Sequence, residues 1–174
     1  MRTPDYVNLD AVSSSLMDNT SAIEQLDSVR YLYLRELSEP NDNSLRLVVE
    51  EAVVNATGVV NSELPELDSI LKNAAPIESV EGCAIFELYW KHYAAYLVTE
   101  ELDGSNAKDG YDDECYTGKL LRVYSNSHFL DHMARDTGGH IEPLQHYKIV
   151  CLNHLIDVAA CAPPEVQLLT HRGQ

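Results

Sequence analysis

Apolar positions in the first third of the chain follow two different spacings. Between residues 8 and 26 they fall partly at helical spacing, at Leu9, Val12, Leu16, Ile23 and Leu26. Serine and asparagine clusters interrupt this run, so it predicts one or two short surface helices. Residues 29–37 are rich in strand formers, and a polar turn cluster separates them from a second apolar run at 45–54. The two runs predict a β-hairpin, with a helix over 48–55 as an alternative.

The middle of the chain predicts two more strands. Residues 84–90 alternate, so that Phe86, Leu88 and Trp90 share one face, which we expect to be buried. Only Lys91 and His92 separate this run from the next, at 93–99. That spacing predicts adjacent antiparallel strands joined by a tight turn. Residues 55–75 are irregular apart from a possible short helix at 67–73, and residues 100–114 form a loop.

The last third predicts strands at 119–125, 147–152 and 155–160, with a helix at 128–136. Ser127 occupies the N-cap position of this helix, and two glycines follow its end. Pro163 and Pro164 end the ordered pattern. Because several connections are too short for parallel crossovers, the fold class is α+β, with a mostly antiparallel β-sheet and a few short helices. At 174 residues and 45% apolar content, residues 1–174 form a single domain.

The formal charge of −16 is the strongest compositional signal, and it is unevenly spread. Residues 1–114 hold 23 acidic and seven basic residues, whereas residues 115–174 hold five of each. Such a field repels nucleic acid and anionic membranes and attracts basic proteins. Solubility alone could also account for it. Direct binding to nucleic acid or to a membrane is therefore not expected.

The chain shows neither a signal peptide nor an apolar run of membrane-spanning length, so we expect a cytoplasmic protein. Four cysteines, without any C-x-x-C pair, indicate free thiols. These are Cys83, Cys115, Cys151 and Cys161, and we expect them to be structural.

The segment from residue 100 to residue 114 carries seven acidic residues and one lysine. A solvated loop is one interpretation, and a docking surface for a basic partner is the other. The partner-binding candidates are Glu100, Glu101, Asp103, Asp109, Asp112, Asp113 and Glu114. The spacing does not match a calcium-binding EF-hand loop.

Histidines are concentrated in the last third of the chain. His128 and His132 lie four residues apart on the predicted helix, so they share a face and could bind one metal ion if folding brings His146, His154 or Asp157 close to them. The H-E-x-x-H motif is absent, and we expect neither a metal nor another cofactor. No nucleophile motif, phosphate-binding loop or dinucleotide fingerprint occurs. The chemistry of the sequence therefore favours a protein that is not an enzyme.

Three segments carry a resemblance. They are Phe86–Trp90 through Tyr96, Gly118–Ser125 with Phe129–Asp131, and His146–Val158. Together they resemble a group of uncharacterised small acidic bacterial proteins, which implies a bacterial origin and one continuous domain but no transferable activity. Small acidic bacterial proteins of this kind are often immunity proteins that neutralise a toxin.

The sequence leaves three functional hypotheses. The leading one is a non-enzymatic immunity protein or inhibitor that binds a basic bacterial toxin, such as a nuclease, through an acidic surface. The second is a small metal-dependent enzyme that uses the C-terminal histidines. The third is a structural or adaptor subunit.

Overall fold

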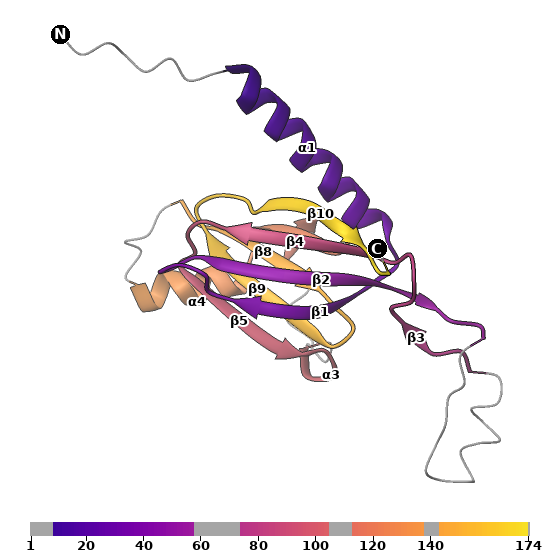
Figure 1. Ribbon diagram of the computed structural model, residues 1–174. Coiled ribbons are helices and arrows are strands. Elements are labelled where there is room, and N and C mark those ends of the chain that lie inside the picture. The colour runs from indigo at the N-terminus through magenta and orange to yellow at the C-terminus, as the bar shows by residue number, and fades with distance from the viewer. Residues whose placement is uncertain (1–8, 58–73, 105–112, 138–142, 174) are drawn as a thin grey trace.

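Two antiparallel sheets form the frame of the molecule in the computed structural model, which describes residues 9–57, 74–104, 113–137 and 143–173 (Figure 1). The first sheet has the order β1 (Tyr31–Ser38), β2 (Leu45–Val54), β4 (Ala84–Trp90) and β10 (Glu165–His171), with β3 (Ile77–Glu78) paired to the end of β2. The second has the order β5 (Ala95–Glu100), β9 (His154–Ala160), β8 (Gln145–Val150), β7 (Leu121–Asn126) and β6 (Cys115–Thr117).

Helices flank these sheets. The helix α1 (Leu9–Ser28) contacts β10 and β7 at its C-terminal end, while its N-terminal end extends away from the sheets (Figure 1). The four-residue α3 (Glu101–Gly104) follows β5, and α4 (His128–Thr137) packs on β8. The α+β class with antiparallel sheets is therefore confirmed. No helix in the described part of the chain is long and apolar enough to cross a membrane.

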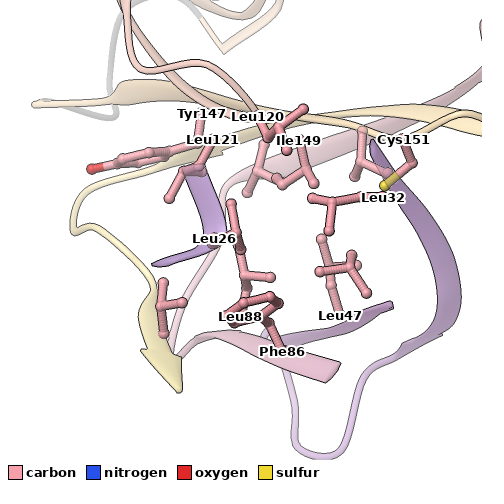
Figure 2. Close-up of a cluster of buried hydrophobic side chains, with 14 of the residues drawn as sticks. Leu26, Leu32, Leu47, Phe86, Leu88, Leu120, Leu121, Tyr147, Ile149 and Cys151 are labelled. Carbon is pink, nitrogen blue, oxygen red and sulfur yellow. The ribbon is translucent and has the colours of Figure 1, made fainter. Parts of the chain in front are cut away.

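The two sheets face each other across one apolar core. Strand alternation sends Phe86, Leu88 and Trp90 inward from β4, and each is at most 1% exposed. Tyr147 and Ile149 approach from β8, and the Trp90 and Tyr147 ring centroids lie 6.0 Å apart. Figure 2 shows the two rows of side chains, with Leu26 of α1 between them. The predicted buried face of residues 84–90 is confirmed.

The predicted pairing of the two middle strands is wrong. The strand β4 pairs with β2 and β10, whereas β5 pairs with β9 in the other sheet. The intervening residues cross between sheets, because Tyr93 N–H donates to Asn43 O on one side and Ala94 N–H donates to Ala159 O on the other. A short polar link between two apolar strands fits a hairpin and a sheet-to-sheet crossover equally well.

Several smaller expectations are also corrected. Residues 9–28 form one helix of 20 residues, because tertiary contacts override the weak helix formers in the run. The alternative helix over 48–55 does not form, since β2 pairs along its length with β1 and β4. The ordered pattern continues past Pro163 and Pro164 as β10, an edge position that tolerates a preceding proline. The possible helix at 67–73 lies outside the described residues.

Side-chain amides close the edges of the first sheet. Leu34 pairs with Val49 of β2, and its outward-facing backbone groups bind Asn153, whose side chain accepts from Leu34 N–H at 2.9 Å and donates to Leu34 O at 3.1 Å. On the far edge, Asn19 of α1 accepts from Val166 N–H at 2.6 Å and donates to Pro164 O at 3.3 Å. Both asparagines satisfy backbone groups that a further strand would otherwise use.

We expect Asn153→Ala to lower the free energy of unfolding by about 1–3 kcal/mol, because two backbone groups at Leu34 lose their partners. Urea denaturation of the variant and the wild type would measure the change. Asn153→Asp is the matched variant, since it keeps the acceptor but places a carboxylate against Leu34 O. A midpoint unchanged in both variants would show that the contact does not hold the sheets together.

Candidate functional site

The described residues at the two ends of the acidic segment, 100–104 and 113–114, lie at opposite edges of the second sheet. Glu100 ends β5 opposite His154, at one edge, and Glu101 and Asp103 lie in α3. Asp113 and Glu114 precede β6, which forms the other edge. The two parts are also far apart along the strand direction. Glu100 is level with the β8–β9 turn, whereas Cys115, which follows Glu114, pairs with Asn126 at the other end of the sheet.

The predicted acidic residues are thus separated into two groups. Glu100, Glu101 and Asp103 belong to one corner of the sheet, and Asp113 and Glu114 to the diagonally opposite corner. The remaining two, Asp109 and Asp112, lie outside the described residues. The described side chains therefore place negative charge at two separate corners, from Glu100 and Glu101 at one and from Asp113 and Glu114 at the other.

The second group interacts with the start of α4. Glu114 accepts a hydrogen bond from His128 N–H at 2.9 Å, and Asp113 contacts His128 Nε2 at 2.8 Å. A carboxylate at a helix N-terminus compensates unpaired backbone N–H groups and the positive end of the helix dipole. Glu114 consequently has a structural role in addition to its charge, whereas the Asp113 side chain remains 64% exposed.

The four candidate metal-binding histidines have separate surroundings. His128 contacts Asp113, and His132 contacts Asp136 one turn along α4 at 3.5 Å. His146 is buried on β8, and His154 begins β9 opposite Glu100. Among the described residues, no three histidine, cysteine or acidic side chains form a group that could hold a metal ion.

A buried polar chain links α4 to the second sheet. Ser127 Oγ lies 2.7 Å from His146 Nδ1, and His146 Nε2 lies 2.7 Å from Asp157 Oδ1. Lys148 Nζ approaches the same carboxylate oxygen at 3.1 Å. The residues Ser127, His146 and Asp157 are each less than 10% exposed. A charge buried this deeply is tolerated because it has a cationic and a hydrogen-bonding partner.

Strand alternation explains why these polar side chains meet. Side chains alternate along β8, and Tyr147 and Ile149 point into the core. His146 and Lys148, which alternate with them, therefore point to the outer face. Asp157 occupies the outer face of β9 and pairs in register with Lys148. The ring of Tyr124 stacks on His146 with centroids 4.2 Å apart, and Phe129 of α4 covers it at 5.1 Å.

The contacts run from serine to histidine to aspartate, as in a hydrolase triad, but their geometry favours a structural role. An ionised carboxylate only accepts hydrogen bonds, so His146 Nε2–H donates to Asp157, and in the neutral ring Nδ1 is the acceptor for the Ser127 hydroxyl. In serine hydrolases the serine meets the opposite ring nitrogen. Ser127 Oγ also caps α4 by accepting from Leu130 N–H at 3.1 Å. A nucleophile that is 4% exposed could not reach a substrate without movement of α4.

Sequence reasoning identified Ser127 as the helix cap but did not connect it with His146 and Asp157. The available signal was polar residues inside apolar strands, since Asp157 stands between Ile156 and Val158. Buried polar groups in such positions need partners from neighbouring strands. Which strands are neighbours was not determined by the local pattern.

The outer face of the first sheet carries a ladder of ion pairs. Arg46 of β2 contacts Glu36 of β1 at 2.7 Å and also contacts Glu87 of β4. The hydrogen bond from Arg46 lowers the pKa of Glu36 below its ordinary value. Gln167 of β10 donates to Glu87 at 2.6 Å and extends the ladder across all four strands. Arg46, Glu36 and Glu87 therefore already have their ion-pair and hydrogen-bond partners within the chain.

The cysteines are free thiols, as expected. Cys83 and Cys151 are buried, and Cys115 and Cys161 are exposed. Burial raises the pKa of Cys151 to about 12, so its thiol stays protonated at neutral pH and is a poor nucleophile.

Comparison with known proteins adds no relative: no protein-family model, no curated protein and no solved structure matches the chain. These comparisons therefore assign no function to the chain.

Proposed function

We propose that this protein is a non-enzymatic immunity protein, which neutralises a basic bacterial toxin such as a nuclease by binding it through acidic surface. The observation that carries the proposal is the −16 charge of the chain together with ion pairs that already engage five of the nine described lysines and arginines. The bacterial context comes from the sequence resemblance.

Most described basic side chains already contact a carboxylate of the same chain. Of the nine described lysines and arginines, five form such ion pairs, namely Arg35, Arg46, Lys91, Lys148 and Arg172. Exposed carboxylates therefore dominate the field that an approaching protein meets. Such a field accelerates encounter with a basic partner and rejects polyanions, which suits an inhibitor that competes with nucleic acid for a nuclease.

The chemistry of the buried groups supports a binding role over a catalytic one. Ser127 caps α4, two aromatic rings cover His146, and the Cys151 thiol is buried and protonated. The free thiols fit a reducing compartment, so we place the proposed function in the cytoplasm, where a toxin producer needs protection.

The first test is capture of a partner from the bacterial host at low ionic strength, with the full chain as bait. We expect a basic protein, with a pI above about 9, that arrests growth when expressed alone and is silent when co-expressed with this chain. An acidic partner, or a basic one whose toxicity persists on co-expression, would refute the proposal. Capture of stoichiometric assembly subunits without toxicity would favour the adaptor hypothesis instead.

The second test measures the contribution of the acidic segment to association with that purified partner. We expect conversion of Asp109, Asp112, Asp113 and Glu114 to their amides to slow association on the order of tenfold at about 50 mM salt and to flatten its salt dependence. The amide of Glu114→Gln keeps an oxygen acceptor for His128 N–H, so α4 should keep its cap.

A matched control removes the same charge from other places on the surface. It converts four exposed carboxylates to amides, at Glu24, Asp42, Glu78 and Glu81. Equal slowing in both quadruple variants would assign the effect to net charge. If the first variant binds with unaltered rate and salt dependence, the segment has no part in docking.

A further inference from the structure

Sheet edges are where another chain can add a strand, and among the described residues the main strand orders end at β1 and β10 in one sheet and at β5 and β6 in the other. At β1, Leu34 is bonded to Asn153 and Leu32 O accepts from Leu152 N–H at 2.8 Å. At β10, Asn19 bonds the backbone at Val166, and a bulge follows Leu168. Both edges of the first sheet are consequently blocked or irregular.

The two edges of the second sheet differ from each other. The strand β6 has three residues and an irregular register after Cys115. The strand β5 has six residues, pairs with β9 without a register shift, and has β9 as its sole backbone partner among the described residues. Every second residue of β5 therefore directs its backbone N–H and C=O away from the sheet.

The side chains along β5 have a distinct chemistry. Leu97 is 51% exposed and Val98 is 38% exposed, although they point to opposite faces of the sheet. Leu102 of α3, which packs beside β5, is 68% exposed. The carboxylates of Glu100 and Glu101 follow directly and form no ion pair with another described residue. An apolar, regular edge thus ends in negative charge.

We propose that the β5 edge binds an extended, basic segment of the partner protein, which adds to the second sheet as a sixth strand. Main-chain hydrogen bonds would supply affinity, while Leu97 and Val98 contact apolar side chains and Glu100 and Glu101 contact lysines or arginines. The inference deepens the proposed function, on which it rests, by assigning the docking element and the conformation of the bound segment.

A second copy of this chain fits the edge less well. Each copy carries a formal charge of −16, so pairing two β5 strands brings strongly like-charged molecules together. A basic segment instead gains from the same charge.

The test uses synthetic peptides with alternating lysine and valine, and matched peptides in which glutamate replaces lysine. We expect the lysine peptide to slow amide hydrogen exchange in β5 by about tenfold or more at saturation, and the glutamate peptide to leave it unchanged. N-methylation of alternate peptide residues should abolish the protection, because it removes the strand hydrogen bonds.

A pair of variants separates this edge from the rest of the surface. Leu97→Lys places a cation on the β5 edge and should weaken binding of the lysine peptide by about tenfold or more. Leu168→Lys makes the same change on β10, where Asn19 occupies the edge. Its affinity for the lysine peptide should stay within about twofold of the wild-type value. Both positions are exposed, so both variants should fold.

The results that would overturn the inference are distinct from those that refute the proposed function. Equal binding of both peptides, absence of β5 protection, or equal weakening by the two variants would exclude a basic strand at β5. Protection of β5 that rises with protein concentration alone would assign the edge to a second copy. If the captured toxin binds Leu97→Lys as tightly as wild type, the immunity function stands and the docking site lies elsewhere.

Discussion

Phe86→Ala is expected to lower the free energy of unfolding by about 3–5 kcal/mol. Phe86 is 1% exposed and belongs to the core cluster, in the row of side chains beside Leu88 that lies opposite Tyr147 and Ile149 (Figure 2). Truncation removes the apolar ring and leaves a cavity that β2 and β10, paired on either side of β4, cannot fill without shifting. Chemical denaturation monitored by the fluorescence of Trp90, the single tryptophan, would measure the loss.

The matched control for Phe86 is Leu168→Ala on β10, directly paired with Phe86 in the register. Leu168 is 37% exposed, so its truncation should cost less than about 1 kcal/mol. Equal effects of the two substitutions would mean that the core is not where the alternation of β4 places it.

Asp157→Ala should lower the free energy of unfolding by about 3 kcal/mol, the second large effect that we expect. The substitution leaves His146 Nε2 without its acceptor and removes the carboxylate beside Lys148, both in surroundings with little access to water. Because His146 also holds Ser127, the start of α4 should loosen, which amide exchange at Leu130 would report.

Two further variants show whether burial causes this effect. Asp157→Asn keeps an oxygen acceptor for His146 and should have an intermediate effect. Asp113→Ala breaks the exposed contact with His128 and should cost less than about 1 kcal/mol. An Asp157→Ala protein as stable as the wild type would show that the buried chain contributes nothing to the fold.

Local sequence patterns predicted the strands well where alternation was strong. Residues 84–90, 119–125 and 155–160 were expected as strands and overlap β4, β7 and β9. Ser127 was expected as the cap of the helix at 128–136, and it accepts from Leu130 N–H as that role requires. These features depend on residues close in the chain, so period and capping suffice to identify them.

The candidate site was only partly accessible from the sequence. The −16 charge and its concentration before residue 115 follow from composition alone. That Glu100 and Glu114 lie at opposite corners depends on the order of five strands, which no local pattern encodes. The same order brings Ser127, His146 and Asp157 together over separations of 19 and 11 residues.

The sequence by itself determined the α+β class, the inward face of β4 and the negative field of this protein, because each depends on residue type or on spacing within one element. Only the tertiary structure decided that β4 and β5 belong to different sheets and that asparagines block the edges at β1 and β10. The physical reason is that strand pairing satisfies backbone groups that are the same in every residue. Partner choice therefore depends on how the whole core packs, and so does the edge left open at β5.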